Sequence, residues 1–377
     1  MLSVQEFAGR SENLVALIRR LVEIESPTTD KAGVDRVGRL VAAEFQRLGA
    51  QVSLDEQPIT GNHVIGRWGD AAGSRDGILV LCHMDTVYDL GTLARQPCVE
   101  VDGRLMGPGT MDMKASLAML LTAVQALNEV GQQPRRPLTA LFTSDEETGS
   151  ETSRVLVETL AREAALVLCL EPCLPDGSVK TWRKGVGDFT IEVRGKAAHA
   201  GADHERGRNA IEELAQHVLA IQKLTDYSLG TTLNVGVISG GTRSNVVPDH
   251  AQAVVNMRVM TQAEADRITS WMLALRPLMD GTQIEVTGGL NRPPMPRDAL
   301  MAATYARARE IAASLGIDLR EGGTGGGSDA NLVAPLGIPV LDGLGARGNG
   351  AHSEREHVLI ASLPERTALL AAILSEW

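Results

Sequence analysis

The chain has 377 residues, of which 44% are hydrophobic and 22% charged, so it has the composition of an ordinary globular enzyme and the length of a two-domain protein. Its formal net charge of −11 argues against nucleic acid as the main partner, because neutralising phosphate groups requires a basic surface. No apolar stretch approaches the roughly 18 residues that cross a bilayer, and the N-terminus lacks the features of a signal peptide, which predicts a cytoplasmic protein with no membrane partner.

Two amphipathic helices are predicted near the N-terminus, over residues 12–24 and 34–48, because apolar side chains recur there at helical spacing. Gly49 directly follows the second pattern and is suited to cap that helix. Strands are then expected over residues 51–55 and 63–68.

The most informative stretch is the apolar run over residues 78–82, which ends in His83 and, two residues later, Asp85. Such a run indicates a buried strand, and the carboxyl end of a strand in an open α/β sheet faces the crevice where ligands bind. Because side chains alternate along extended chain, His83 and Asp85 are expected on the same side, where an imidazole that binds a metal would have a carboxylate beside it. Taken alone, a hydrogen-bonded loop histidine is the simpler interpretation.

Two later strands are also expected to end in carboxylates. The apolar run over residues 138–144 is followed by Glu146 and Glu147, and the run over residues 165–170 is followed by Glu171. A single acidic strand end is commonly a solvated side chain. Three strands that each end in a histidine or a carboxylate at the same edge of a sheet indicate a functional site instead.

Two further candidates come from loops. Asp112 lies just before a predicted helix whose apolar face begins at Leu117, and its alternative role is to cap that helix. His352 lies in a glycine-rich loop near the C-terminus, where a solvated histidine is the default interpretation. With the three strand ends, these two residues complete a candidate set of metal ligands.

From about residue 185 the sequence changes to an alternation of apolar and polar residues, which is typical of half-exposed antiparallel strands. The strands and helices expected here follow the β-α-β-β-α-β order of a ferredoxin-like domain. We therefore predict an inserted domain over residues 185–292, within a catalytic domain formed by residues 1–184 and 293–377. The expected strands are 189–194, 232–237, 253–258 and 282–286, and the expected helices are 211–224 and 262–279.

A helix is expected over residues 298–315, followed by a glycine-rich segment over residues 321–330. A phosphate-binding loop is an unfavourable interpretation of these glycines, because no Gly-Lys-Ser/Thr follows and no strand is predicted directly before them. A close approach of the backbone near the active site is favoured instead.

Seven short motifs follow one another along the chain. They are His83-Met84-Asp85-Thr86-Val87, Gly109-Thr110-Met111-Asp112-Met113-Lys114, Asp145-Glu146-Glu147-Thr148-Gly149, Glu171-Pro172, Gly195-Lys196-Ala197-Ala198-His199-Ala200-Gly201, Asn245-Val246-Val247-Pro248 and Ala351-His352. In this order they resemble the motifs of the dizinc metallopeptidases of the aminoacylase/carboxypeptidase/acetylornithine deacetylase family. Each motif is weak by itself, but the ordered set is specific, and the resemblance runs from about residue 20 to the C-terminus.

The resemblance implies a site for two zinc ions, with cobalt or manganese as alternatives, and the residue types are ordinary zinc ligands. It also implies a cis peptide bond between Asp112 and Met113. The implied roles are His83 and Glu171 on one ion, Glu147 and His352 on the other, Asp112 bridging both, Glu146 as general base and Asp85 as the residue that orients His83.

The fold class implied is α/β, with a zinc-peptidase-like mixed sheet that has helices on both faces, plus an inserted ferredoxin-like α+β domain for dimerisation and closure. A homodimer is expected through the inserted domain. The resemblance places His199 at the scissile carbonyl as an oxyanion stabiliser, often across a dimer interface, with assistance from Asn245. Arg258 is a candidate for binding a substrate carboxylate, and a solvated strand-end charge is an equally good interpretation.

Three segments look most like the glutamate carboxypeptidase branch of this family. They are Arg183-Lys184-Gly185, residues 240–245 and Arg292-Pro293-Pro294. Members of that branch remove a C-terminal glutamate from peptides or folate-like compounds. We therefore expect a small-molecule or short-peptide substrate. The alternatives are an N-acyl-amino-acid deacylase of the acetylornithine deacetylase or succinyl-diaminopimelate desuccinylase type, and an inactive metal-binding scaffold. The intact Glu146 argues against the scaffold.

Overall fold

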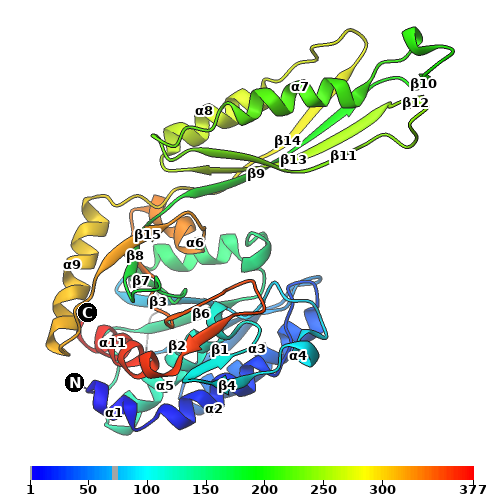
Figure 1. Cartoon of the computed structure of the whole chain (residues 1–377). Coiled ribbons are helices and arrows are strands. Elements are labelled where there is room, and N and C mark those ends of the chain that lie inside the picture. The colour runs from blue at the N-terminus through cyan, green and yellow to red at the C-terminus, as the bar shows by residue number, and fades with distance from the viewer. Residues whose placement is uncertain (1, 70–74) are drawn as a thin grey trace. The chain divides into compact units, whose positions relative to one another are not determined.

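The chain folds into two units in a computed structural model that describes residues 2–69 and 75–377 (Figure 1). The first unit comprises the chain up to Trp182 together with Arg297–Gly323 and Ser328–Trp377. The second comprises Arg183–Pro296 and Thr324–Gly327. The short second segment joins this unit because Arg183 Nη1 donates hydrogen bonds to the carbonyl oxygens of Gly326 (3.2 Å) and Gly327 (2.8 Å).

An eight-stranded mixed sheet forms the centre of the first unit, in the order β1-β2-β6-β3-β7-β16-β8-β15. Its inner strands β6, β3, β7 and β16 are parallel to one another, whereas β1 and β2 pair antiparallel and β8 pairs antiparallel with β16. The strands are β1 Gln51–Asp55, β2 His63–Trp68, β3 Gly77–His83, β6 Leu138–Thr143, β7 Ala164–Cys169, β8 Val179–Arg183, β15 Glu321–Thr324 and β16 Val340–Asp342.

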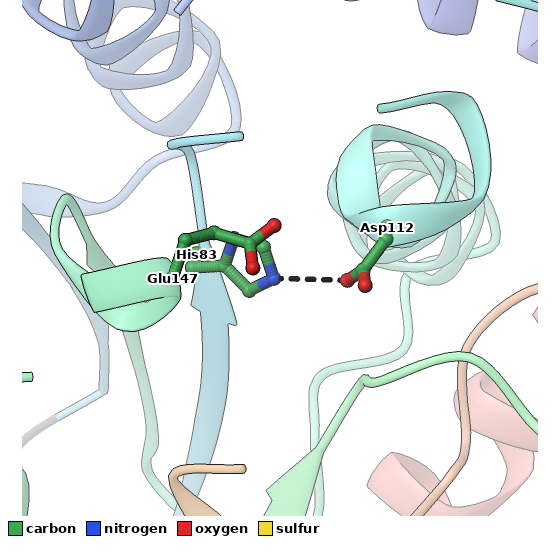
Figure 2. Close-up of side chains that lie close together, drawn as sticks. All are labelled: His83, Asp112 and Glu147. Atoms are coloured by element: carbon green, nitrogen blue, oxygen red, sulfur yellow. Dashed lines mark hydrogen bonds and ion pairs between the residues drawn. The ribbon is translucent and has the colours of Figure 1, made fainter. Parts of the chain in front are cut away.

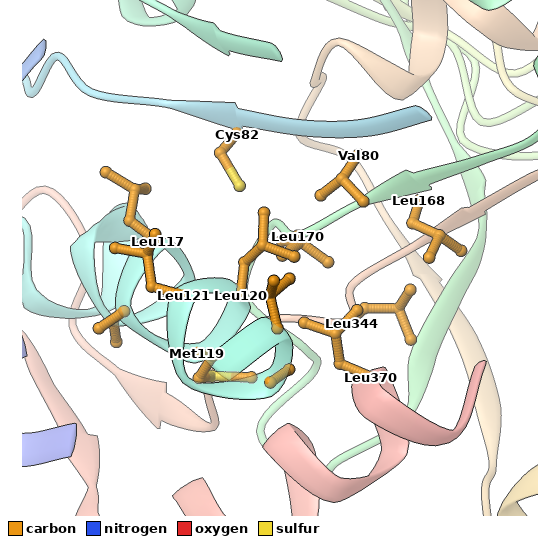
Figure 3. Packing of buried hydrophobic residues seen from close by; sticks show 14 of the residues in the cluster. Val80, Cys82, Leu117, Met119, Leu120, Leu121, Leu168, Leu170, Leu344 and Leu370 are labelled. Atoms are coloured by element: carbon orange, nitrogen blue, oxygen red, sulfur yellow. The ribbon is translucent and has the colours of Figure 1, made fainter. Parts of the chain in front are cut away.

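Helices cover both faces of this sheet, as the resemblance implied. Every residue of β3 is buried, and its side chains alternate between the two faces. Figure 3 shows Val80 and Cys82 directed toward the helix that carries Leu117 and Leu121. Residues of the opposite face, such as Leu81, are buried as well. The helices are α1 Val4–Ala8, α2 Ser11–Val22, α3 Lys31–Arg47, α4 Thr92–Arg95, α5 Ala115–Glu129, α6 Arg154–Arg162, α9 Ala299–Ser314, α10 Ala330–Val333 and α11 Leu363–Glu376.

A second, smaller sheet in the first unit has the order β17-β18-β5-β4. It pairs β5, which precedes Asp112, with β18, which follows His352, so that His357 lies opposite Met106. Two segments far apart in the sequence are therefore held side by side. The strands are β4 Val99–Val101, β5 Arg104–Met106, β17 Gly348–Asn349 and β18 His357–Leu359.

The glycine-rich segment contains a strand, β15, where none was expected from the sequence. The predicted close approach of the backbone does occur, but its partner is an indole ring of the first unit. A Cβ atom on Gly323 would lie 2.1 Å from the ring of Trp182, so no larger residue fits there. Glycine-rich sequence is a poor indicator of a strand, because glycine has low strand propensity.

The second unit is a four-stranded antiparallel sheet in the order β11-β13-β9-β14. Two helices lie on one face of this sheet (Figure 1), and Phe189, Leu214 and Ile268 are among the side chains buried between them. The elements follow one another as β-α-β-β-α-β, and a short pair of strands, β10 and β12, is added. They are β9 Gly185–Arg194, β10 Ala198–His199, α7 Ala210–Gln222, β11 Thr232–Gly240, β12 Val246–Val247, β13 His250–Val259, α8 Gln262–Leu273 and β14 Gln283–Arg292.

Helix α8 ends at Leu273, six residues before the predicted end at residue 279. Pro277 explains the difference, because the residue before a proline is disfavoured in helical conformation. The backbone N–H groups of Leu278 and Met279 instead donate to the carboxylate of Glu213 on α7, at 2.8 Å each. Among residues 2–69 and 75–377, no helix is both long and apolar enough to cross a membrane.

Candidate metal centre

His83 is the last residue of β3, and its imidazole ring is buried between two aspartates. Its Nδ1 atom lies 3.0 Å from the backbone oxygen of Asp85 and 3.4 Å from the Oδ1 atom of the same residue. Its Nε2 atom lies 3.1 Å from Asp112 Oδ1, a contact that Figure 2 shows as a dashed line. The structure thus brings His83 and Asp85 together on one side of the strand end.

Asp112 lies between two imidazoles that come from distant parts of the chain. Its Oδ1 atom faces His83, and its Oδ2 atom lies 3.2 Å from Nε2 of His352. The backbone at Asp112 is not helical (φ −115°, ψ 90°), and the peptide bond from Asp112 to Met113 is cis, as the resemblance implied. Asp112 therefore precedes α5 without being its N-cap, and each of its oxygens has its own histidine.

Three glutamates surround the two histidines. His352 Nε2 lies 3.4 Å from Glu147 Oε2, and His83 Nε2 lies 3.6 Å from Glu171 Oε1. Potential ligand atoms of His83, Asp112 and Glu147 all lie within 4.8 Å of one another, and so do those of His83, Glu146 and Glu171. Distance alone therefore does not separate Glu146 from the ligand candidates, and its role as base comes from the resemblance.

The donor set suits divalent cations. It consists of imidazole nitrogens and carboxylate oxygens, which are ordinary ligands of zinc. Glu147 Oε1 is buried and has no hydrogen-bond partner among the described residues, as expected for an atom that would coordinate a cation. These residues therefore fit a metal centre.

The electrostatics of the site also fit a metal centre. Burial raises the pKa of Glu147 to about 7, and hydrogen bonds to Asp112 and Glu147 raise the pKa of His352 to about 11. Burial alone would lower the pKa of His83, but hydrogen bonds to Asp112 and Asp85 outweigh it and raise that pKa. Burial opposes the ionised form of Asp112, yet hydrogen bonds from His352 and His83 lower its pKa. The carboxylates of the cluster thus strongly favour positive charge on the groups between them.

Asp85 connects His83 to the segment that carries Glu147. Its Oδ2 atom accepts hydrogen bonds from Thr28 Oγ1 at 2.6 Å and from the backbone N–H of Glu147 at 3.2 Å. The carboxylate of Asp85 is fully buried. These contacts hold its position relative to the imidazole, as expected of a residue that orients a ligand.

Two residues that were not predicted from the sequence stabilise the loop that carries Glu146 and Glu147. Asp145 Oδ2 accepts hydrogen bonds from Thr152 N (2.7 Å), Thr152 Oγ1 (2.8 Å) and Ser153 N (3.3 Å). The buried ring of His63 lies 3.1 Å from Ser144 Oγ on one side and 3.1 Å from Thr152 Oγ1 on the other. Asp145 adjoins the glutamates in the sequence, but no local pattern identifies His63.

A third missed residue, Glu356, lies beneath Asp112. It is fully buried, and its carboxylate accepts hydrogen bonds from the backbone N–H groups of Met111 (2.8 Å), Asp112 (3.0 Å) and Gly109 (3.1 Å). The hydroxyl of Tyr88 also donates to it. The sequence around Glu356 offered little to identify this role, because Glu356 is one of several charged residues that follow His352.

The remaining candidates belong to the second unit. His199 is exposed, and its Nδ1 accepts hydrogen bonds from the N–H groups of Gly201 and Ala202, both at 3.1 Å. The proton of a neutral ring is therefore on Nε2, which makes that atom a donor. The backbone oxygen of Asn245 accepts from Ala200 N at 3.0 Å, so the structure brings the His199 and Asn245 segments together.

Arg258 is half-buried at the end of β13, and burial lowers its pKa. Its Nε donates to Asn256 Oδ1 at 2.9 Å and its Nη1 donates to Gly325 O at 3.2 Å. These contacts use two of the five N–H groups of the guanidinium. Arg258 is thus held in place by contacts within its own unit.

Comparisons with known proteins agree with this geometry. Residues 79–376 match the family described as Peptidase family M20/M25/M40. Carboxypeptidase G2 of Pseudomonas sp. (strain RS-16) is 30% identical over 373 residues, which cover 96% of this chain and 89% of that protein. A succinyl-diaminopimelate desuccinylase of Alkalilimnicola ehrlichii is 30% identical over 299 residues, covering 74% of this chain and 76% of that protein. The crystal structure of aminopeptidase PepT from Bacillus cereus superposes with a TM-score of 0.73 at 25% identity, covering 97% and 98% of the two chains.

Proposed function

This chain belongs to Peptidase family M20/M25/M40 and is a metal-dependent peptidase or amidohydrolase, and from this premise we propose that it releases a C-terminal amino acid such as glutamate from a peptide or a folate-like compound. The observation that carries the proposal is the position of Asp112, whose two oxygens face His83 and His352 separately. One carboxylate between two imidazoles suits a centre with two ions, because each of its oxygens could serve a different ion.

In the proposed site, His83 and Glu171 would hold one ion, Glu147 and His352 would hold the other, and Asp112 would contribute to both. Zinc is the proposed metal, with cobalt or manganese as substitutes. When bound, two such ions supply Lewis acidity that makes water a nucleophile at neutral pH and polarises the amide carbonyl.

The protein's own residues then move the protons. Glu146 takes a proton from the attacking water and gives it to the leaving amine, so that one carboxylate is first the base and then the acid. Asp85 keeps the ring of His83 oriented through its contact with Nδ1.

The second unit is proposed to bind the substrate. His199 has its donor on Nε2, which suits a hydrogen bond to the negative oxygen that develops on the carbonyl, and Asn245 assists. Arg258 has N–H groups beyond those bound to Asn256 and Gly325, which suits a bidentate contact with the carboxylate of a C-terminal residue.

We further propose that the protein is a homodimer through the second unit. Strand β11 is at the edge of the sheet, and two of its apolar side chains, Val237 and Ile238, are 59% and 56% exposed. An edge strand with exposed apolar residues can pair with the same strand of a second copy around a two-fold axis.

A second candidate function is deacylation of N-acyl amino acids, because the desuccinylase relative has the same identity to this chain as the carboxypeptidase relative. A substrate panel separates the two. The metal-loaded protein would be incubated with N-acyl-glutamates and folate analogues on one side, and with acetylated and succinylated amino acids on the other. Fastest release of glutamate supports the proposal, whereas a higher kcat/KM on the acetylated or succinylated amino acids overturns it in favour of deacylation.

A further inference from the structure

Glu356 has every hydrogen-bond position of its carboxylate occupied. Its Oε1 atom accepts from the N–H groups of Met111 and Asp112, and its Oε2 atom accepts from the N–H of Gly109 and from the hydroxyl of Tyr88. A carboxylate has about four acceptor sites, so all of them are used. The side chain is 0% exposed, so bulk water does not reach these contacts.

The segment that Glu356 binds satisfies only some of its backbone N–H groups by itself, such as that of Thr110, which donates to Gly107 O at 3.2 Å. Asp112 and Met113 have non-helical dihedral angles immediately before α5, so the N–H groups of residues 109–112 do not have a regular helical set of acceptors. A buried N–H group without a partner is destabilising, because it has lost its hydrogen bonds to water and gained none in return. Glu356 supplies the acceptors and thereby determines where the backbone of Asp112 lies.

Glu356 also connects Asp112 to the segment of His352. It lies four residues after His352 and directly before β18, and its backbone oxygen accepts a hydrogen bond from Gly107 N at 3.3 Å. The hydroxyl oxygen of Tyr88, which donates its one proton to the carboxylate, also lies 3.0 Å from the backbone oxygen of Ser353. One buried side chain therefore holds two segments whose Asp112 and His352 face each other at 3.2 Å.

We propose that Glu356 is a positioning residue of the metal centre, which holds the Asp112 carboxylate between His83 and His352 by binding the backbone beneath it. The inference rests on the proposed function, in which Asp112 is shared by both ions. Residues of this kind typically change metal affinity or activity by about 10- to 100-fold when they are replaced.

The alternative is that Glu356 only stabilises the fold, and the chain contains a matched control for that case. Glu213 in the second unit is also 0% exposed and also accepts four hydrogen bonds, from Leu278 N, Met279 N, Thr282 Oγ1 and His217 Nε2. It contacts none of the candidate ligands described above. A purely structural carboxylate at either position would affect stability alone.

The first measurement uses the metal-free, full-length protein and follows amide hydrogen exchange in a peptide that spans residues 107–114. In Glu356→Gln, one oxygen still faces Met111 and Asp112, but an NH₂ group opposes the N–H of Gly109. We expect exchange in this peptide to be at least tenfold faster than in wild type, and Glu213→Gln to leave it unchanged. Equal exchange in wild type and Glu356→Gln would overturn the proposal.

The second measurement is metal affinity, by competition with a chromophoric chelator, together with the visible spectrum of the cobalt-loaded protein. We expect Glu356→Gln to bind cobalt about 10-fold more weakly, Glu356→Ala about 100-fold more weakly, and both to have altered cobalt bands. Glu213→Gln should retain wild-type affinity and the wild-type spectrum. If Glu356→Ala does not fold, the glutamine variant alone decides the question.

The outcomes separate this inference from the proposed function. Wild-type protein that binds no cation would overturn the proposed function, and the inference with it. Wild-type protein that binds two cations while Glu356→Gln binds them equally well, with an unchanged spectrum, would overturn only the role of Glu356. Equal losses of affinity in Glu356→Gln and Glu213→Gln would also overturn it, because they would reflect general destabilisation.

Discussion

The two oxygens of a carboxylate in this site have different surroundings, and this difference decides what the side chain can do. Asp112 faces His83 with one oxygen and His352 with the other, while Asp85 faces His83 with Oδ1 and binds Thr28 with Oδ2. Glu147 has one oxygen near His352 and one without a hydrogen-bond partner among the described residues. Replacing such a residue therefore removes contacts with identified groups and does not only change the net charge of the site.

Glu146 is expected to be needed for turnover and not for metal binding. Glu146→Gln should lower kcat by about 10²- to 10⁴-fold, because it removes the base while leaving every proposed ligand in place. Metal content, measured by atomic emission, should equal that of wild type, and Glu147→Gln should lose metal. Loss of metal in Glu146→Gln instead would mean that the two glutamates have exchanged roles, which the geometry allows because each has a potential ligand atom within 4.8 Å of one on His83.

Asp112→Ala is expected to lose both ions, since one carboxylate faces both histidines. The circular dichroism spectrum of the variant should remain that of a folded protein, because the apolar face of α5 stays buried. Metal analysis after dialysis tests this expectation. Two tightly held ions in the variant would contradict the shared role of Asp112.

At the scale of elements, the parallel strands assemble the site and helix α7 supports the second unit. Strands β3, β6 and β7 run parallel, so the residues that follow their carboxyl ends, including His83, Glu147 and Glu171, meet at one edge of the sheet. In the second unit, Glu213 of α7 holds the loop after α8 by accepting the N–H groups of Leu278 and Met279.

Glu213 is expected to make stability depend on pH. Burial by itself would raise the pKa of Glu213, but hydrogen bonds from Leu278, His217 and Met279 outweigh it and lower the pKa below its ordinary value of 4.5. Its contribution is therefore present above pH 4.5 and is lost as the pH falls toward the folded-state pKa.

The test compares wild type with Glu213→Gln by urea unfolding at several pH values. At pH 7 the variant should have a free energy of unfolding lower by about 1 to 3 kcal/mol, because it leaves a buried N–H group without an acceptor. The difference should shrink as the pH falls below 4.5, since only wild type loses a charged acceptor. A difference that stays constant with pH would contradict this role.

At the scale of the whole molecule, the chain leaves the first unit after Trp182, forms the second unit and returns at Arg297. The proposed ligands and base belong to the first unit, whereas His199, Asn245 and Arg258 belong to the second. Catalysis as proposed therefore needs both units, and in a homodimer the second unit that serves a metal centre can come from the neighbouring subunit.

His199→Ala is expected to lower kcat by about 10²- to 10³-fold, the usual effect of removing one donor to an oxyanion, with metal content unchanged. If His199 serves the neighbouring subunit, mixing His199→Ala with Glu146→Gln subunits should restore activity, because one site of each heterodimer is then intact. Activity and subunit exchange would be measured together, the latter by native mass spectrometry. Heterodimers as inactive as either parent would show that His199 does not act across the interface.

The sequence by itself determined the features that depend on local pattern. Mainly apolar runs predicted β3, β6 and β7, because a strand buried on both faces has few polar positions. The residues that follow these runs include His83, Glu147 and Glu171. The alternation of apolar and polar residues after residue 185 predicted the antiparallel sheet of the second unit, because a strand with one exposed face is polar at every second position. The roles of the marked residues rest on resemblance and stay predictions.

Only the tertiary structure decided the contacts between distant segments. Glu356 lies 244 residues from Asp112, and His63 lies 89 residues from Thr152, so neither contact leaves a periodic signal in the sequence. Strand β15 forms in a glycine-rich segment because the neighbouring strand and the ring of Trp182 outweigh its low local propensity. A buried carboxylate acquires its role from the groups that the fold brings to it, and those groups are fixed by packing rather than by neighbours in sequence.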